Sequence, residues 1–337
     1  MDAAEELDIV IVGAGICGLA TALALRTKGI KSVILERSDT LRASGAAIAI
    51  LTNGWRALDQ LGIGPQLRRT ALPLQGRGEA RWVKRSDLIE MLAEDLPHGT
   101  IRLGCQLLSV ELDPFTNFPT LQLRDGRILK AKILIGCDGA SSKVAEFLGI
   151  KSNKLFPACA MRGLTYYPSP HGFAPEFVRT HGNNVVCGRS TMTENLVFWF
   201  LLLPGYHDRA WDILLGTLRK GTVTVAGDSM HVMGPFIGQG GLAAMEDSIA
   251  LARCLAHKIH GETGLEGNYG LRKEVEEAID MYVKERRMRL VRLSARTYVT
   301  GLMLSTPSMK MKLLLFALII VLFQDPLRHT SYNCGHL

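Results

Sequence analysis

Short apolar runs alternate along this chain with longer segments whose apolar residues recur at helical spacing. Aliphatic residues dominate the runs 8–12, 133–135 and 222–226. Such runs are typical of strands that helices cover on both faces of a sheet. Helical periodicity follows the first and the last of them, over 19–27 and 242–258. The alternation predicts an α/β fold built on a parallel sheet.

Capping residues predict two more helices in the first hundred residues. Asn53 precedes a periodic segment over 54–61, and Ser86 precedes another over 87–96. Both residue types commonly accept hydrogen bonds from the first turn of a helix, so we expect each to be an N-cap. Gly62, Gly64 and Pro65 are expected to end the first of these helices.

Residues 150–205 are expected to form a separate, mostly β segment. Prolines interrupt it, and the run 196–203 has the pattern of a strand, with Trp199 and Phe200 interpreted as core residues. Ahead of this segment, an Asp-Gly pair at 125–126 lies between two alternating runs, which predicts a β-hairpin.

The remainder of the chain is expected to be mainly helical. A helix is predicted over 208–218, and a long one over 271–296 carries Arg289, Arg292 and Arg296 on one face. We interpret that face as solvated, because charge rows on helices more commonly face water than nucleic acid.

Composition narrows the class of partner. The 337 residues are 47% hydrophobic, enough for a full core, and the formal charge of +7 comes from Lys and Arg spread along the whole chain. This distribution favours a basic surface serving an anionic cofactor over nucleic-acid binding. The seven cysteines show no metal-ligand spacing, so no metal and a reducing compartment are expected. Acidic residues precede the first strand, which disfavours a targeting peptide and predicts a cytoplasmic location.

One apolar run, 313–323, carries no charge and follows Lys310 and Lys312. A bilayer span needs about twenty such residues. We therefore expect a buried C-terminal helix, with peripheral attachment to a membrane as the alternative.

The chain is organised around Gly13-Ala14-Gly15-Ile16-Cys17-Gly18, a glycine motif between the first strand and the first helix. Its glycines allow a tight turn, close approach of a pyrophosphate, and close packing of helix on strand. Glu36 ends the next short strand, where a carboxylate can accept hydrogen bonds from a ribose diol. These features predict a bound adenine dinucleotide, either NAD or FAD.

Two later segments repeat the order of strand, glycine turn and helix. The segment 136–144 contains Asp138 and Gly139, and the segment 227–241 contains Asp228 and ends in Gly238-Gln239-Gly240-Gly241. Helix N-termini favour anions, so two of them in one fold could bind the two ends of a long dinucleotide.

These motifs together resemble the single-component FAD-dependent aromatic hydroxylases, which are the para-hydroxybenzoate hydroxylase-like flavoprotein monooxygenases. Within this family, the sequence is most similar to a plant branch with salicylate-hydroxylase-like and zeaxanthin-epoxidase-like members. The resemblance implies a Rossmann-like FAD-binding domain of glutathione-reductase type, an inserted mostly β substrate domain, and C-terminal helices. It also implies that Asp228 contacts the ribitol chain and that Pro235 lies near the isoalloxazine. The residues expected to bind FAD are Gly13, Gly15, Ile16, Gly18, Glu36, Arg37, Arg85, Asp138, Gly139, Gly227, Asp228, Pro235, Gly238, Gly240 and Gly241.

The same resemblance divides the chain into five stretches. Residues 1–70 and 71–149 would form the first two parts of the FAD-binding domain, and 150–220 a shortened substrate domain. Residues 221–260 would complete the FAD-binding domain, and 261–337 would form a C-terminal helical region, in a monomer or a homodimer.

The implied reaction uses NAD(P)H as electron donor and O2 to hydroxylate or epoxidise a small-molecule substrate. The cofactor carries this chemistry, so no catalytic side chain is named, and His231 is interpreted as structural. NADH and NADPH stay open as donors, as do an aromatic acid and an isoprenoid-like compound as substrates. The candidate substrate contacts are Arg162, Tyr166, Phe198 and Phe200.

Two connections, 61–85 and 203–227, are shorter than is typical of the family. A reduced substrate domain would open the site to water. The second hypothesis is therefore a catalytically impaired FAD-binding protein or ligand-binding relative. The third, an NAD-dependent dehydrogenase, explains the first glycine motif but gives Asp138 and Asp228 no role.

Overall fold

The protein is described by a computed structural model over residues 4–41, 47–74, 78–150, 159–174, 176–182, 185–203, 216–259, 268–306, 308–323 and 328–337. Its main sheet has the strand order β14-β15-β9-β1-β2-β6, and β8 and β7 extend from β9. The bounds of these strands are β1 Glu5–Val12, β2 Val33–Leu35, β6 Ile101–Arg102, β7 Leu107–Leu112, β8 Pro119–Leu123, β9 Ile128–Gly136, β14 Arg219–Lys220 and β15 Val223–Val225.

The register of the parallel strands determines where the loops that carry the sequence motifs lie. Val12 lies opposite both Leu35 and Gly136, and Gly136 lies opposite Val225. Four neighbouring parallel strands, β2, β1, β9 and β15, therefore end at one edge of the sheet. The loops that follow them, which carry the sequence motifs, leave the sheet side by side.

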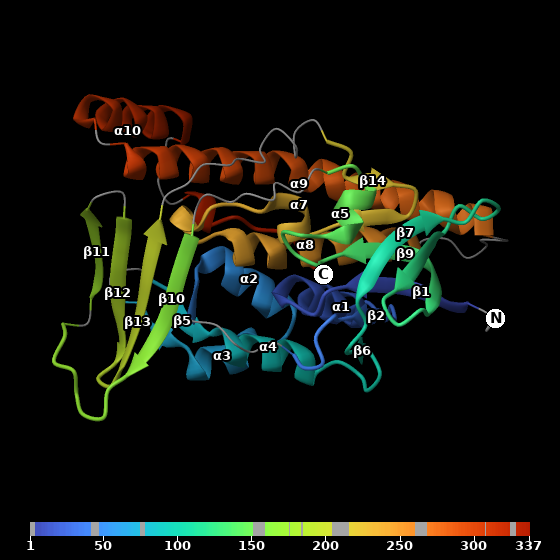
Figure 1. Ribbon diagram of the computed structural model, residues 1–337, viewed down its shortest axis with the longest axis horizontal. Coiled ribbons are helices and arrows are strands. Elements are labelled where there is room, and N and C mark those ends of the chain that lie inside the picture. The colour runs from blue at the N-terminus through green and yellow to red at the C-terminus, as the bar shows by residue number, and fades with distance from the viewer. Residues whose placement is uncertain are drawn as a thin grey trace.

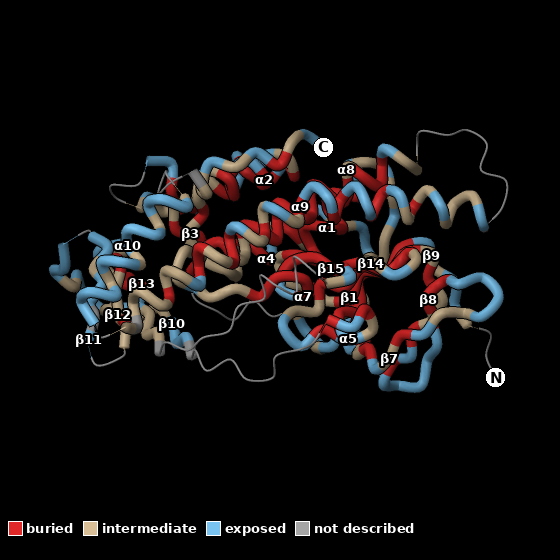
Figure 2. Tube along the Cα trace, turned by 90° about the horizontal axis from the view of Figure 1, so that it is seen from above, coloured by how far each residue is buried: buried red, intermediate tan, exposed pale blue. Residues whose placement is uncertain are grey.

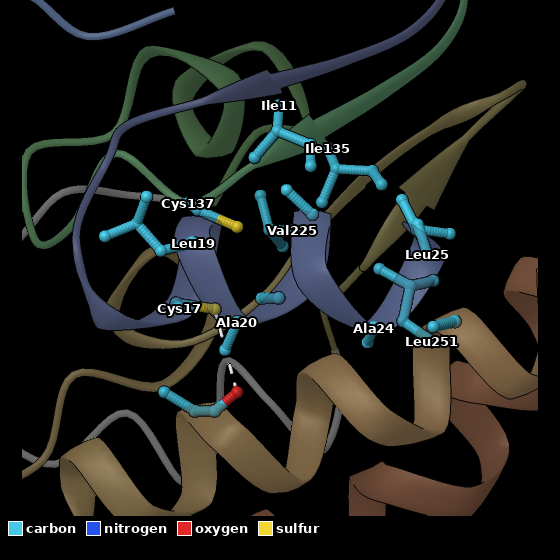
Figure 3. Close-up of a cluster of buried hydrophobic side chains, with 14 of the residues drawn as sticks. Ile11, Cys17, Leu19, Ala20, Ala24, Leu25, Ile135, Cys137, Val225 and Leu251 are labelled. Carbon is cyan, nitrogen blue, oxygen red and sulfur yellow. Dashed lines mark hydrogen bonds between the residues drawn. The ribbon is translucent and has the colours of Figure 1, made fainter. Parts of the chain in front are cut away.

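Helices cover this sheet in successive layers (Figure 1). Helix α1 packs against the sheet and against α8, and α9 packs on the other side of α8. Figure 3 shows Ile11, Ile135 and Val225 of the sheet facing α1, with Leu251 of α8 beyond it. The helices here are α1 Ile16–Thr27, α2 Thr52–Gln60, α3 Gly64–Thr70, α4 Arg85–Glu94, α5 Lys143–Phe147, α7 Asp228–His231, α8 Gly240–Ile259 and α9 Asn268–Ser305, with the 3-10 turns η1 Pro235–Ile237 and η2 Arg328–Thr330.

Two smaller sheets lie at the other end of the molecule. The four-stranded antiparallel sheet has the order β10-β13-β12-β11, and the three-stranded sheet has the order β3-β5-β4. Trp82 of β5 joins them, because its indole Nε1 donates to Ser190 Oγ (2.9 Å) and its ring packs 4.6 Å from that of Phe198. The bounds are β3 Ala47–Ile50, β4 Leu72–Pro73, β5 Arg81–Lys84, β10 Cys159–Tyr166, β11 Phe177–Gly182, β12 Val185–Thr193 and β13 Leu196–Leu203.

The sequence prediction of an α/β fold with a mostly β insertion is confirmed, and so is the hairpin at 125–126. The two runs after that turn form one strand, β9, because it pairs with β8 at its start and with β1 along most of its length. The predicted helix over 208–218 lies largely outside the described residues.

Both predicted N-caps are wrong. Helix α2 begins at Thr52, so Asn53 lies inside it, and α4 begins at Arg85, so Ser86 lies inside that helix. Neither helix has a side-chain cap. Of the residues expected to end α2, Gly64 and Pro65 start α3. Pro65 lies in the first turn of α3, a position where proline's missing N–H costs nothing.

The apolar run near the C-terminus is helical but not buried. It forms α10, Met309–Phe323, in which no residue is buried. Figure 2 shows this helix as mostly exposed, in contrast to the buried centre formed by α1, α8 and the main sheet. The prediction of a buried helix is wrong because α9 alone packs substantially against α10 in the described part of the chain. Trp199, also expected in the core, is 36% exposed.

Candidate functional site

A cavity of about 500 Å³ opens where the strands of the main sheet end. The three motif segments supply most of its lining: the turn after β1 with the start of α1, the turn after β9, and the loop between β15 and α8. The end of β2 with the residues after it, Arg85, and residues 105–107, which the sequence analysis did not predict, complete the lining. Of the residues predicted to bind a cofactor, those on the cavity wall are Gly13, Gly15, Ile16, Glu36, Arg37, Arg85, Asp138, Gly139, Asp228, Gly240 and Gly241. Gly18, Gly227, Pro235 and Gly238 are not on it.

The first turn depends on the different positions of its glycines. Gly13 has φ +99°, which favours glycine, and its N–H donates to Leu35 O (2.7 Å). A Cβ on Gly18 would lie 1.9 Å from Gly13 O, so only glycine lets α1 pack this closely. A Cβ on Gly15 would meet nothing within 4 Å, because Gly15 faces the cavity.

The N-terminus of α1 is open toward the cavity. Its N-cap, Gly15, offers no side chain, and the first turn contains no acidic residue. The first N–H groups of a helix have no partner within the helix and carry its positive dipole end. Glu36 supports the turn from the side, since its carboxylate accepts from Ala14 N (2.8 Å) and Ser38 N (3.0 Å).

The second turn is held together by Asp138. Its carboxylate accepts from Lys143 N (2.7 Å), from Ser142 Oγ, and from Ser229 Oγ of the third segment (3.2 Å). Burial raises the pKa of Asp138 above its ordinary value despite these hydrogen bonds. The network therefore links the second and third segments beside the cavity.

Asp247 on α8 holds the third segment in place through hydrogen bonds. Gly227 has φ +61°, and its N–H donates to Asp247 Oδ2 (3.0 Å), which fixes the turn that presents Asp228 to the cavity. His231 Nε2 lies 2.5 Å from the same oxygen, and both side chains are fully buried. Burial would lower the pKa of His231, but the charge of Asp247, its hydrogen bond and the charge of Asp228 together raise this pKa above its ordinary value. His231 therefore lies buried and hydrogen-bonded under the loop, which is the placement that its interpretation as a structural residue predicts.

Arg286 of α9 completes a buried charge cluster with α8. Its Nε donates to Asp247 Oδ1 (2.7 Å) and its Nη2 to Glu246 Oε2 (2.8 Å), with all three side chains fully buried. Burial would raise the pKa values of both acids, but Arg286 and the other cationic neighbours lower them below their ordinary values. The cluster holds α9 to the part of α8 that follows the cavity.

The sequence prediction missed this cluster. Arg289, expected on a solvated face, donates to Glu246 Oε1 (2.9 Å) with its side chain 11% exposed, and Arg296 is also buried, so that expectation is wrong for both. Arg292 does face water. Asn53 donates to Glu246 Oε1 (2.7 Å), which accounts for its place inside α2. The adjacent acids at 246–247 within an otherwise apolar helical pattern are the signal that could have predicted buried cationic partners.

The four candidate substrate residues share one face of the four-stranded sheet but do not line the cavity. Arg162 pairs with Phe200, and Leu164 with Phe198, so alternate residues of β10 and β13 lie on the same face. This face meets the three-stranded sheet through Phe198. Phe198 is buried, whereas Arg162 and Tyr166 are exposed.

Two family profiles match the two parts of the chain that line the cavity. The profile described as FAD dependent oxidoreductase matches residues 8–169, and that described as FAD binding domain matches 207–294. Monooxygenase 1 of Arabidopsis thaliana is 46% identical, in an alignment covering 99% of this chain and all of that protein. This chain belongs to the FAD-dependent monooxygenases. The match to an Arabidopsis protein also agrees with the resemblance to the plant branch.

The present chain also shares its fold with solved structures. Klebsiella pneumoniae HpxO, complexed with FAD and uric acid, superposes with a TM-score of 0.73 at 19% identity, over 96% of this chain and 95% of its own. A salicylate hydroxylase substrate complex gives 0.71 at 17% identity, over 99% of both chains. At such identities the likeness concerns the fold.

The Arabidopsis alignment bears on the predicted shortening. The alignment spans 396 positions, whereas the chain described here has 337 residues. Part of the relative is therefore aligned with no residue of this chain.

The residues present fit FAD. The cavity wall combines the uncapped N-terminus of α1, the open space beside Gly15, and Gly240 and Gly241 at the start of α8. This donor set suits the pyrophosphate at one end and an electron-rich ring at the other. Arg37, Arg85 and Lys143 add positive charge on the same wall.

Proposed function

We propose that the protein is an NAD(P)H-dependent monooxygenase that hydroxylates or epoxidises a small aromatic or isoprenoid-like molecule with O2. The meeting of three chain segments at one cavity carries this proposal. An NAD-dependent dehydrogenase would need the first segment alone, whereas a flavin monooxygenase uses all three. FAD, when bound, supplies the electron transfer and the activation of oxygen.

The chain's own residues would bind, orient and shield the reacting groups. Gly13, Gly15 and the α1 N-terminus would hold the pyrophosphate, Glu36 the ribose, and Asp228 the sugar-alcohol chain. The N–H groups at Gly240 and Gly241 would stabilise negative charge on the reduced ring. Gly18, Gly227, Pro235 and Gly238 would act by shaping the turns.

The substrate would lie between the third segment and the inner face of the four-stranded sheet. Phe200, whose ring centroid lies 6.2 Å from that of the buried Phe198, would provide apolar surface there. Arg162 and Tyr166 on the same face would provide polar contacts at its rim. The two aromatic rings support a planar or apolar substrate.

A visible absorption spectrum tests the cofactor first. We expect flavin bands to remain with the protein after addition of FAD and desalting. Next, NADH and NADPH are compared as donors in air while the candidate substrate is varied. Substrate-stimulated donor oxidation with oxygenated product would support the proposal, and a colourless protein would contradict it.

The alignment gap supports one alternative, a flavin-binding relative with impaired oxygenation. A substrate side lacking residues would admit water, so oxygen would leave as hydrogen peroxide. The two functions are separated by the ratio of product to peroxide for each donor molecule oxidised. Peroxide alone, with every substrate of both classes, would favour the impaired form.

A further inference from the structure

Helix α10, Met309–Phe323, is apolar and exposed around most of its circumference. Leu313, Leu314 and Phe316 are 63%, 61% and 54% exposed, and Val321 and Leu322 are 71% and 59% exposed. At 3.6 residues per turn, these positions and the neighbouring exposed ones cover about two-thirds of the helix surface. Monomeric proteins rarely leave a continuous apolar surface of this kind in water.

In the described part of the chain, the partly covered residues of this helix, 312, 315, 319 and 323, recur on one of its sides. Helix α9 supports it, and near its end Phe323 lies under the guanidinium of Arg296, 5.3 Å from the ring centroid. In Figure 1, α10 lies along the outer side of α9 at the end of the molecule that holds the four-stranded sheet. The apolar surface is therefore presented outward by a firmly packed support.

The chemistry of α10 favours a lipid surface over a protein groove. A groove covers one face of an amphipathic helix, whereas α10 has no polar face beyond its first turn. A bilayer surrounds a helix with apolar material on every side except the one that faces its own protein.

Length decides how the helix could enter the bilayer. Fifteen residues extend about 22 Å at 1.5 Å per residue, less than the roughly 30 Å hydrocarbon core. Within the described residues, no helix is both long enough and apolar enough to cross a membrane. The helix can therefore lie in one leaflet but not span both.

Charge indicates which lipid. Lys310 and Lys312 are the only charged residues of α10, and both lie in its first turn. Long cationic side chains at a helix end can reach the headgroups while the rest of the helix is immersed. Anionic headgroups would attract them, together with a chain of net charge +7.

We propose that α10 inserts into one leaflet of an anionic lipid bilayer and holds the protein at the membrane surface, with Lys310 and Lys312 at the headgroups. This proposal does not depend on the proposed reaction.

The test is flotation of the full, FAD-loaded chain with vesicles of phosphatidylcholine, with and without phosphatidylserine. We expect the protein to float with the anionic vesicles. Leu314→Glu, Phe316→Glu and Val321→Glu together should weaken binding at least about a hundredfold, since each apolar side chain of this size contributes about tenfold or more. Phe115→Glu is the matched control, because Phe115 is 91% exposed in the β7–β8 hairpin and should leave binding unchanged.

A second pair of variants tests the charge. Lys310→Gln and Lys312→Gln should each weaken binding to the anionic vesicles about fivefold and leave binding to pure phosphatidylcholine unaltered. Equal losses on both vesicles would contradict the assignment of the lysines to headgroups.

Three outcomes would overturn the proposal: no flotation of the wild type, equal flotation of the triple variant, or a dimer that the triple variant abolishes without any vesicle binding. The last would assign α10 to a second copy of the chain. Should the triple variant fail to fold, Phe316→Trp replaces it. Its emission should shift to the blue and be quenched by brominated lipid, and an unchanged spectrum would overturn the proposal.

Discussion

Arg286 determines whether two neighbouring acids can be buried beneath the cofactor cavity. Glu246 and Asp247 are both fully buried and both accept hydrogen bonds from its guanidinium. Such a cluster adds little net stability compared with an apolar core, but removing one partner leaves uncompensated charge. The cluster instead fixes the geometry of the third segment through Gly227.

Arg286→Met should therefore destabilise the protein by about 3–5 kcal/mol, because it leaves two buried carboxylates short of a cation. Urea unfolding measures the loss. Arg292→Met, on the exposed side of the same helix, should change the free energy of unfolding by less than about 0.5 kcal/mol. Similar losses in the two variants would show that the buried pairing does not matter.

His231 predicts a pH dependence with a definite sign. The charge of Asp247 raises its pKa despite burial, and Asp228 adds to this while Arg286 opposes it. The stability from protonated His231 is thus complete below the unfolded value of about 6.5 and is lost as pH rises through the higher folded value. Asp247 stays ionised over this range, because its own pKa is lowered.

The measurement is the difference in free energy of unfolding between wild type and His231→Gln as a function of pH. We expect it to shrink as pH rises above about 6.5. A difference that is constant or grows with pH would contradict the pairing of His231 with Asp247.

At the scale of elements, the unit that matters is strand, glycine turn and helix. The glycines of the first turn have different roles. Gly18 allows α1 to pack closely on the turn, and Gly15 leaves open space on the cavity wall. Replacing each glycine by alanine is therefore expected to affect a different property: FAD binding for Gly15 and the stability of the FAD-free protein for Gly18.

Gly15→Ala should leave the stability of the FAD-free protein unchanged, since its Cβ meets nothing within 4 Å. It should weaken FAD binding about tenfold, because the added methyl holds an anion away from the helix N-terminus. Gly18→Ala should destabilise the FAD-free protein by about 1–3 kcal/mol, because its Cβ would overlap Gly13 O. Thermal unfolding and FAD titration separate these effects, and equal behaviour would contradict the assignment.

At the scale of the molecule, the cavity joins segments that are far apart in sequence. One wall comes from residues of the first match, 8–169, and the other from the second, 207–294. The C-terminal tail adds another long-range connection, because Tyr332 lies over the guanidinium of Arg289 at 4.4 Å. A ligand in the cavity would therefore stabilise the whole protein.

We expect FAD at a hundred times its Kd to stabilise the protein by about 2.7 kcal/mol relative to the FAD-free form. The shift in Tm on removing and restoring FAD measures this. AMP, which can occupy only the part of the site at the first turn, is the control and should stabilise less. No shift with FAD would contradict binding to the folded state.

Sequence alone determined the main sheet and most of the cavity wall, because those features depend on local patterns. Apolar runs specify buried strands, and glycine turns such as the one at Gly13 need a backbone conformation that few other residues adopt. Tertiary structure decided what no local pattern encodes. Asn53 is a buried hydrogen-bond donor rather than a cap, and Arg289 faces Glu246 rather than water, because the partners come from helices distant in sequence. The same holds for α10: its residues specify an apolar helix, but only the packing of the other elements shows that its surface is left exposed.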